Sequence, residues 1–495
     1  MKKDLDVIKR YQRELTLLNQ TNSLLDWDQQ TYMPRDGVAS RADQKALISS
    51  LTHARITSDE LFGSVKRLKR IHLSGSNKIM VDKLFTQILR HRKLPKEFVE
   101  ELSKRTSLAF SAWENAKTQN HFDVFAPHLE KIVQLKRKQA QYINLSGHPY
   151  NGLMDEFEEG MTVEKIKPAF DELKKQLLAL LAMIEKSGCY KSQKLKSPGH
   201  SVQRDVQMQM CRDVIERIGL DKEKSRIDFS AHPFTTTIGI HDVRITTNIR
   251  PNSWFAFEST IHEAGHALYE LNMPEKFAYT VLREAPSYGL HESQSRFWEN
   301  MIGKSKPFWK YYSRKYNGKD KLNLDFDQLY REINRITPGL IRVESDEIHY
   351  CLHIILRFEL ETGLIEGSVK VKDLPDIWNR KMKEMIGVVP KNNTEGVLQD
   401  VHWSCGLFGY FPSYALGSIY AAQIYDTIKR DIPDMEKNIS RGDFGIVRKW
   451  LLEHIHGYGA TYSADDLIRK ICGERLNPRV YINYLTRKYR EIYTF

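Results

Sequence analysis

The sequence predicts a mainly α-helical protein in which residues 1–495 form one large unit. Apolar residues recur three and four positions apart over long segments, as expected for helices that bury one face. Four such segments are residues 4–28, 163–186, 346–366 and 420–432. Short stretches rich in glycine and proline separate the helical segments, and neither an internal repeat nor a long low-complexity linker interrupts them. We therefore expect a single domain.

Residues 232–249, HPFTTTIGIHDVRITTNI, depart from this helical periodicity. β-branched residues dominate the segment and Gly239 lies near its middle, which predicts a hairpin or a pair of short strands. An exposed strand edge can bind an extended peptide through main-chain hydrogen bonds. The alternative is a purely structural hairpin.

The charge balance does not by itself indicate a function. The net charge is +12, but the basic residues are spread along the chain among 63 acidic ones. The short basic runs 66–70 and 90–93 lie in helical, polar contexts, so solvated helix faces explain them better than contacts with nucleic acid. We expect no nucleic-acid partner.

The cysteines and the N-terminus indicate a soluble protein in a reducing compartment. The five cysteines form no CxxC pair, and an odd number cannot all pair within one chain. The N-terminal segment is amphipathic and charged, without the apolar stretch of a signal peptide. The longest apolar run, 177–184, is far shorter than the roughly 18–20 residues that span a membrane. We expect a cytoplasmic protein without membrane contact.

Residues 253–271 predict a helix that carries a metal-binding pattern. Asn252 or Ser253 can cap its start, and Asn272 with Pro274 closes it.

Within this helix, the stretch STIHEAGHALYEL places His262 and His266 one turn apart on one face. Glu263 follows the first histidine, where it can reach a metal-bound water rather than the metal. These are the parts of a His-Glu-X-X-His hydrolase site. The imidazoles hold zinc, the ion acidifies its bound water, and the glutamate takes the proton.

A second pair of histidines shows why spacing alone is insufficient. His349 and His353 have the same separation, but Tyr350 stands where the base is required. We interpret this pair as core histidines rather than a second metal site.

A catalytic zinc ion keeps three protein ligands and one open position, so a third ligand is needed. The segment GLHESQSRFWEN, 289–300, is the candidate helix, and Glu292 is the predicted ligand. His291 competes with it, and glutamates are also common at helix starts for reasons unrelated to metals.

Several further segments, taken in order, resemble the carboxypeptidase Taq family of metallocarboxypeptidases. They are LLDWDQQTYMP, HPF, DVRIT, HESQSRFWEN, IRVESD, GVLQDVHW and FGYFPSYALGS. The resemblance covers essentially the whole chain. It implies a mostly helical fold with a deep cleft, similar to neurolysin and angiotensin-converting enzyme. It also implies one divalent metal per chain, removal of C-terminal residues from peptides with a free C-terminus, and a homodimer.

The resemblance also implies roles for individual residues. His262, His266 and Glu292 correspond to the metal ligands and Glu263 to the general base. The segments that contain His232 and Arg244 resemble those that line the substrate cleft.

Three other residues correspond to groups that contact the substrate. Arg342 resembles the residue that holds the substrate's terminal carboxylate, for which a guanidinium is well suited, and Arg244 is the second candidate. His402 and Tyr414 lie where transition-state stabilisers are expected. Tyr410 is the rival donor to Tyr414.

Three functions are weighed on this basis: a metallocarboxypeptidase, an oligopeptidase that cuts internally with the same chemistry, and a basic protein that binds nucleic acid. The presence of Glu263 beside the histidines favours an enzyme, and the resemblance favours the carboxypeptidase. Zinc suits two histidines and a glutamate best, although cobalt and manganese also fit such ligands.

Overall fold

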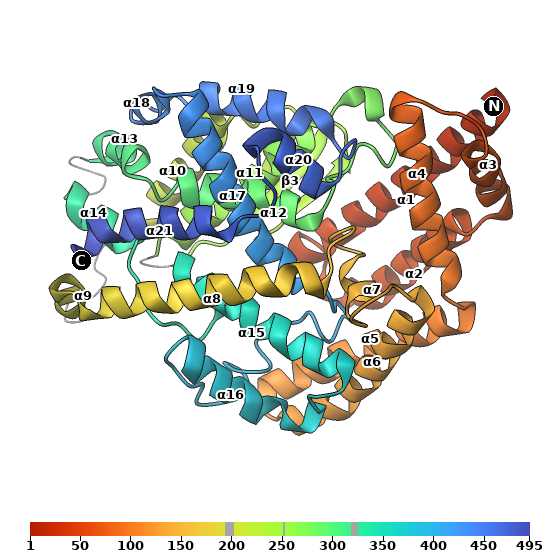
Figure 1. Ribbon diagram of the computed structural model, residues 1–495, viewed down its shortest axis with the longest axis horizontal. Helices are drawn as coiled ribbons and strands as arrows, with labels where there is room; N and C mark the ends of the chain where they lie inside the picture. The colour runs from red at the N-terminus through yellow and green to blue at the C-terminus, as the bar shows by residue number, and fades with distance from the viewer. Residues whose placement is uncertain (194–201, 251–252, 318–324) are drawn as a thin grey trace.

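The computed structural model describes residues 1–193, 202–250, 253–317 and 325–495. Helices dominate, and a small sheet lies among them (Figure 1). The helices of the first half of the chain are α1 (Lys2–Thr31), α2 (Val38–Ile56), α3 (Asp59–Lys69), α4 (Gly75–Lys93), α5 (Lys96–Gln119), α6 (Phe122–Ile143), α7 (Asn151–Met154), α8 (Val163–Lys186), α9 (Gly188–Gln193) and α10 (Arg204–Ile218). The predicted mainly helical fold is confirmed.

The helices of the second half follow the sheet. They are α11 (Phe255–Asn272), α12 (Tyr288–Arg296), α13 (Lys306–Tyr316), α14 (Phe326–Ile333), α15 (Glu347–Glu366), α16 (Leu374–Met385), α17 (Phe411–Asp431), α18 (Met435–Ile439), α19 (Gly445–His454), α20 (Ala464–Cys472) and α21 (Pro478–Tyr493). The predicted metal-binding helix is α11. It begins slightly later than expected, and the Oγ atom of Ser253 accepts a hydrogen bond from the main-chain N of Phe255. Asn252 lies outside the described residues.

The sheet has three strands in the order β1-β3-β2. β2 (Thr235–Gly239) and β3 (Asp242–Thr247) form the predicted antiparallel hairpin, with an irregular register near Gly239. β1 (Ser225–Phe229) pairs with β3 in parallel and was not predicted. It was missed because its five residues, SRIDF, alternate too briefly to stand out from a loop. β2 is an edge strand of this sheet.

Two buried clusters hold the molecule together. The larger extends from Ala109 to Tyr493 and contains the buried faces of α11, α15 and α17. The smaller joins α1, α3 and α4 to the loop residues Val281 and Leu282. Figure 1 shows α1 to α4 together at one end of the molecule, while α8 and α21 lie side by side across the other. The metal-binding helix α11 is therefore anchored in the larger core.

No described helix is both long and apolar enough to span a membrane. All five cysteines are free thiols. The thiols therefore form no cross-link within the chain.

Candidate metal centre

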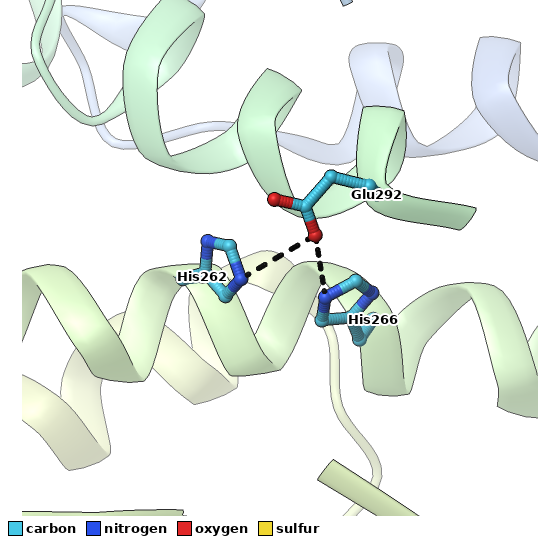
Figure 2. Close-up of side chains that lie close together, drawn as sticks. All are labelled: His262, His266 and Glu292. Atoms are coloured by element: carbon cyan, nitrogen blue, oxygen red, sulfur yellow. Dashed lines mark ion pairs between the residues drawn. The ribbon is translucent and has the colours of Figure 1, made fainter. Parts of the chain in front are cut away.

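One face of α11 presents the residues of the His-Glu-X-X-His pattern to a cavity. His262 and His266 lie one turn apart, and their ring centroids are 5.0 Å from each other. Glu263 lies beside them with only 7% of its surface exposed. Because the helix fixes this spacing, both imidazoles point to the same side of α11 (Figure 2).

Gly265 lets α12 pack directly against α11. A Cβ atom at this position would lie 2.7 Å from the carbonyl oxygen of Gln294 and 2.8 Å from Cα of Ser295. Real side chains do not make contacts that short with a backbone, so only glycine permits this approach of the two helices. The approach brings Glu292 of α12 over the two histidines.

The three predicted ligands converge. Oε2 of Glu292 lies 3.3 Å from Nε2 of His266 and 3.8 Å from Nε2 of His262. All three ligand atoms lie within 4.8 Å of one another, and no other such group of histidine, cysteine and acidic residues occurs in the described parts of the chain. Bonds of about 2.0–2.2 Å in a tetrahedron would separate ligand atoms by roughly 3.4 Å, so the group fits a zinc-sized ion.

Glu299 orients the first histidine. Its Oε2 atom lies 2.7 Å from Nδ1 of His262, which leaves Nε2 of that ring for a metal. Such a carboxylate–histidine contact fixes ring orientation and tautomer at metal sites. Arg296 donates hydrogen bonds to both Glu292 and Glu299, at 2.7 and 3.2 Å. Glu299 lies in a short π-helix, Phe297–Ile302, that continues α12.

These contacts favour carboxylates at Glu292 and Glu299 and a neutral imidazole at His266, whereas Glu292 and Glu299 raise the pKa of His262 against its burial. Burial opposes ionisation of Glu292, but Arg296, His262 and His266 outweigh it and lower the pKa of this carboxyl. The same balance of burial against Arg296 and His262 lowers the pKa of Glu299 to about 2. Burial lowers the pKa of His266 to about 3, so its imidazole is neutral at neutral pH and free to act as a ligand.

Glu263 is held by the hairpin. Thr235 of β2 donates a hydrogen bond from Oγ1 to Oε2 of Glu263 at 2.6 Å. Burial raises the pKa of this carboxyl, partly offset by His262. Oε2 of Glu263 is therefore held by β2, and the residue lines the cavity.

The cavity over the metal centre has a volume of about 480 Å³. Its walls come from α11, α12, α15, α17, the start of the hairpin and the short helix η4 (Arg342–Glu344). His232, Arg342 and Tyr414 line it, as does the rival donor Tyr410. A second cavity of about 620 Å³, between α1, α2 and α4, shares Tyr288 with it. Two adjoining cavities thus extend the space beside the metal centre.

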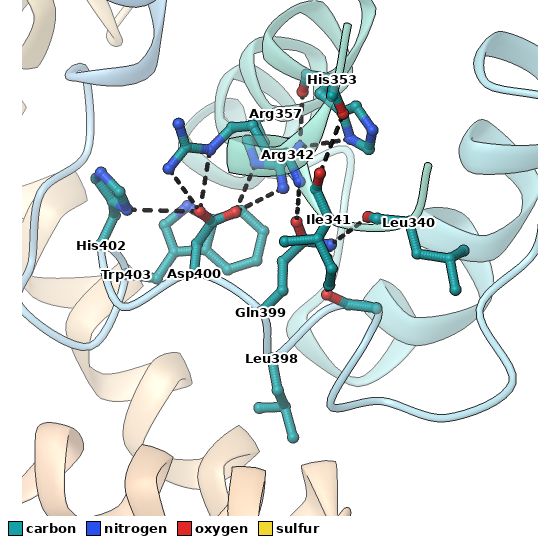
Figure 3. A network of polar contacts seen from close by, with 12 residues as sticks. Leu340, Ile341, Arg342, His353, Arg357, Leu398, Gln399, Asp400, His402 and Trp403 are labelled. Atoms are coloured by element: carbon teal, nitrogen blue, oxygen red, sulfur yellow. Dashed lines mark hydrogen bonds and ion pairs between the residues drawn. The ribbon is translucent and has the colours of Figure 1, made fainter. Parts of the chain in front are cut away.

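Arg342 belongs to a buried network around Asp400 (Figure 3). Its Nη2 atom lies 3.0 Å from Oδ1 of Asp400, and Nη2 of Arg357 lies 2.6 Å from Oδ2 of the same carboxylate. Despite burial, these two arginines lower the pKa of Asp400. Two guanidinium groups share one carboxylate, so the cluster carries one positive charge in excess beside the cavity.

His402 and Tyr414 lie in contact. Nε2 of His402 is 3.2 Å from the hydroxyl of Tyr414. Burial lowers the pKa of His402 to about 3, so the imidazole is neutral. The guanidinium of Arg342 lies 4.8 Å from the centre of the Tyr414 ring. Tyr414 and Arg342 therefore line the cavity, whereas His402 does not line it and contacts Tyr414.

Arg244 lies elsewhere. It is on β3, bonded to Asp242 and stacked 4.3 Å over the ring of Trp27, and it does not line the metal cavity. The competing ligand His291 contacts Glu270 at 2.9 Å and stacks on His266.

The second histidine pair is part of the core. His349 contacts Asp346 at 2.7 Å and His353 contacts the carbonyl oxygen of Gly339 at 3.0 Å, and both are buried. This interpretation is confirmed.

Some residues of the site were not predicted. Glu299 lies seven positions after Glu292, a helical spacing that places both on one face, and this signal was present in the sequence. Thr235, Arg296 and Arg250 also contribute contacts or line the cavity. Tyr350 was interpreted only as the missing base between two histidines, yet it lines the cavity and packs 3.8 Å from the Arg296 guanidinium.

Gly417 of α17 is expected to control the position of Glu292. A Cβ atom there would lie 2.5 Å from Cγ and 2.7 Å from Cβ of Glu292, so the Gly417→Ala variant must displace this side chain. We expect it to weaken Zn²⁺ binding by about 10–100-fold, measured by competition with a chromophoric chelator. Gly188→Ala is the matched control, because a Cβ at 188 meets nothing within 4 Å. Equal affinities in the two variants would contradict the expectation.

A helical fold in which a His-Glu-X-X-His helix and a glutamate of the next helix converge on a cavity defines the class of metal-dependent hydrolases. Comparison with known proteins identifies the family. The sequence profile of the carboxypeptidase Taq (M32) metallopeptidases matches residues 7–489. The chain belongs to this family and is a metallocarboxypeptidase.

Relatives match over nearly their full length. Thermostable carboxypeptidase 1 of Pyrococcus furiosus is 36% identical over 98% of this chain and 97% of its own. Carboxypeptidase 1 of Bacillus subtilis is 35% identical over 99% and 97%. The crystal structure of the M32 carboxypeptidase of Deinococcus radiodurans superposes with a TM-score of 0.94 at 33% identity and covers all of both chains. The predicted family and fold are confirmed.

Proposed function

We propose that His262, His266 and Glu292 hold a single zinc ion and that Glu263 is the general base for peptide-bond hydrolysis. The observation that carries the proposal is the convergence of three ligand atoms beside a fourth, acidic side chain in one cavity. When bound, zinc supplies Lewis acidity toward the scissile carbonyl and lowers the pKa of its water toward about 7. Two imidazoles and one carboxylate are a donor set that suits zinc, although cobalt and manganese also fit.

Glu263 takes a proton from the attacking water and returns it to the leaving amine. Thr235 holds Oε2 of this carboxylate, so Oε1 is the atom that accepts the proton. Burial raises the affinity of the carboxyl for protons, which suits a group that must hold a proton briefly.

Tyr414 stabilises the developing oxyanion. His402 is neutral and, with its proton on Nε2, donates to the Tyr414 oxygen at 3.2 Å. The Tyr414 hydroxyl proton is then directed to the substrate. One such donor contributes about 3–4 kcal/mol to transition-state stabilisation.

Arg342 binds the terminal carboxylate of the substrate. The cluster of Arg342, Arg357 and Asp400 carries one excess positive charge, and Arg342 is its member on the cavity wall. An incoming carboxylate neutralises this charge and accepts charge-assisted hydrogen bonds. Arg244, tied to Asp242 and Trp27 outside the cavity, is less suited to this role.

Paired peptides test the assignment of Arg342. We expect the wild-type enzyme to remove single residues from a peptide with a free C-terminus and to leave its C-terminal amide intact, with products identified by mass spectrometry. Arg342→Ala is expected to lower kcat/KM on the free acid by about 10²–10³-fold, because a carboxylate loses its charge-assisted partner. Internal fragments from both peptides would support the oligopeptidase alternative and remove the assigned role of Arg342.

We further propose a single catalytic domain over residues 1–495, a homodimer and a cytoplasmic location. The larger core, which spans Ala109 to Tyr493, supports the single domain. Five free thiols support a reducing compartment. The homodimer follows from family resemblance alone, and sedimentation analysis of the purified protein tests it. We propose peptides, and neither nucleic acid nor membranes, as partners.

A further inference from the structure

Glu258 lies on the same face of α11 as the metal ligands and lines the same cavity. It is one helical turn before His262, so the helical rise places it about 6 Å nearer the start of α11. Its side chain is partly exposed, and the exposure opens into the cavity. The mechanism proposed above does not use this carboxylate.

Glu258 has no ion-pair or hydrogen-bond partner among the described residues. Lys304 and Glu258 are the opposite charges that act most strongly on each other, yet no ion pair within 4.0 Å joins them among the described residues. Lys488 also acts on Glu258 but is bound to Glu347. Burial raises the pKa of Glu258, and the charge of Lys304 offsets this in part. Because Glu258 is partly exposed to the cavity and directly bonded to no described residue, it can accept a cation from outside the chain.

Glu258 lies at the end of the cavity that Arg250 and Arg342 line. Arg250 lines this end, stacks 3.7 Å over the ring of Phe255 and pairs with Glu344, two residues after Arg342. Phe255 lies one turn before Glu258 on the same helical face. Tyr288 is shared with the adjoining cavity and therefore marks the other end.

The position of Glu258, between the metal ligands and the arginines, limits which part of a substrate it can contact. If Arg342 holds the terminal carboxylate, only the C-terminal residue of the substrate lies between that carboxylate and the scissile carbonyl at the metal. The side chain of that residue must occupy the part of the cavity bounded by α11 and η4. Glu258 is the acidic side chain of α11 that lines this part without a partner.

We propose that Glu258 selects substrates whose C-terminal residue is basic, by pairing with the ammonium of lysine or the guanidinium of arginine. The proposal rests on the proposed role of Arg342. The two charges of a basic terminal residue are then recognised by separate groups: Arg342 binds the main-chain carboxylate, and Glu258 binds the side-chain cation. A neutral terminal side chain makes no ion pair with Glu258. Peptides that end in a basic residue are therefore bound more tightly than peptides that end in a neutral one.

The test uses two peptides that differ only in a terminal lysine or norleucine, because these residues have the same aliphatic chain and differ in the ammonium group. With the zinc-loaded wild-type enzyme, we expect kcat/KM to be about 10–100-fold higher for the lysine peptide, the range for a hydrogen bond to a charged group. In the Glu258→Gln variant the ratio should fall to near one, with the norleucine peptide cleaved as before. Binding of free lysine and norleucine, measured by calorimetry, should show the same loss of preference.

Glu344→Gln is the matched control. It removes a carboxylate from the same region, but Glu344 is half exposed to solvent and does not line the cavity, so the lysine-to-norleucine ratio should not change. Glu258→Lys should favour a terminal glutamate instead. A wild-type ratio near one, or a ratio that Glu258→Gln leaves unchanged, overturns the proposal. Failure of the Arg342 assignment is distinguishable, because it appears as equal cleavage of acids and amides.

Discussion

Replacing Glu263 with glutamine is expected to lower kcat/KM by roughly 10³–10⁴-fold, the upper range for the loss of a general acid–base group. Glutamine has nearly the same shape and can still accept the hydrogen bond from Thr235, which lies 2.6 Å from Oε2 in the native protein. It cannot take a proton from water at neutral pH. Single-turnover hydrolysis of a free-acid peptide, followed by mass spectrometry, measures the chemical step directly.

The metal content of the variant is the control for this experiment. Glu263 is not one of the three converging ligands, so Glu263→Gln should bind one zinc ion per chain, as the wild type does. Full zinc occupancy with the expected loss of rate assigns Glu263 to proton transfer. Loss of zinc would instead place this side chain among the ligands, and retention of the wild-type rate would falsify its role as base.

Removing the metal should also abolish activity, in this case because zinc is lost rather than the general base. His266→Ala deletes one of the three proposed ligands, so we expect zinc to be lost at micromolar concentration and peptide hydrolysis to fall below detection. Chelation of the wild-type protein should have the same effect and should be reversed by added Zn²⁺. The zinc-loaded protein should also be more stable than the chelated one by about 4 kcal/mol when free zinc is 1,000 times its dissociation constant.

Metal analysis and thermal unfolding together measure this second prediction. A matched ligand-neighbour variant is His291→Ala, because His291 stacks on His266 but is bonded to Glu270 and is not one of the converging ligands. It should retain one zinc ion per chain. Chelator-insensitive hydrolysis, or zinc retention by His266→Ala, would be incompatible with the proposed centre.

The candidate metal centre was predictable because its sequence signals are local. His262, Glu263 and His266 lie on one helix, and helical geometry alone places them together. Glu292 required one further assumption, that the next helix returns to the same face, and the close packing allowed by Gly265 makes it so. The hairpin was predictable from its run of β-branched residues, whereas β1, with five residues, was too short to recognise.

The substrate-facing residues were harder to predict because their partners come from distant segments. Arg342 and Arg244 look equally suited to a carboxylate in the sequence. The structure distinguishes them by their neighbours: Asp400 and Arg357 surround the first, and Asp242 with Trp27 holds the second away from the cavity. Such contacts depend on tertiary packing, which residue spacing along one chain does not encode.

The two glycine contacts of α12 have an evolutionary consequence. Gly265 meets the backbone at Gln294 and Ser295, while Gly417 meets Glu292 itself. Gly265, the second X of the His-Glu-X-X-His pattern, therefore cannot be replaced by a larger residue without moving α12. The same holds for Gly417, about 150 positions away and outside any known motif. If α11 were grafted into another protein with both histidines and the glutamate, it would not form this centre by itself. Glycines would also be needed at the positions of Gly265 and Gly417. The centre depends on the packing of three helices, and the five-residue signature describes only one of them.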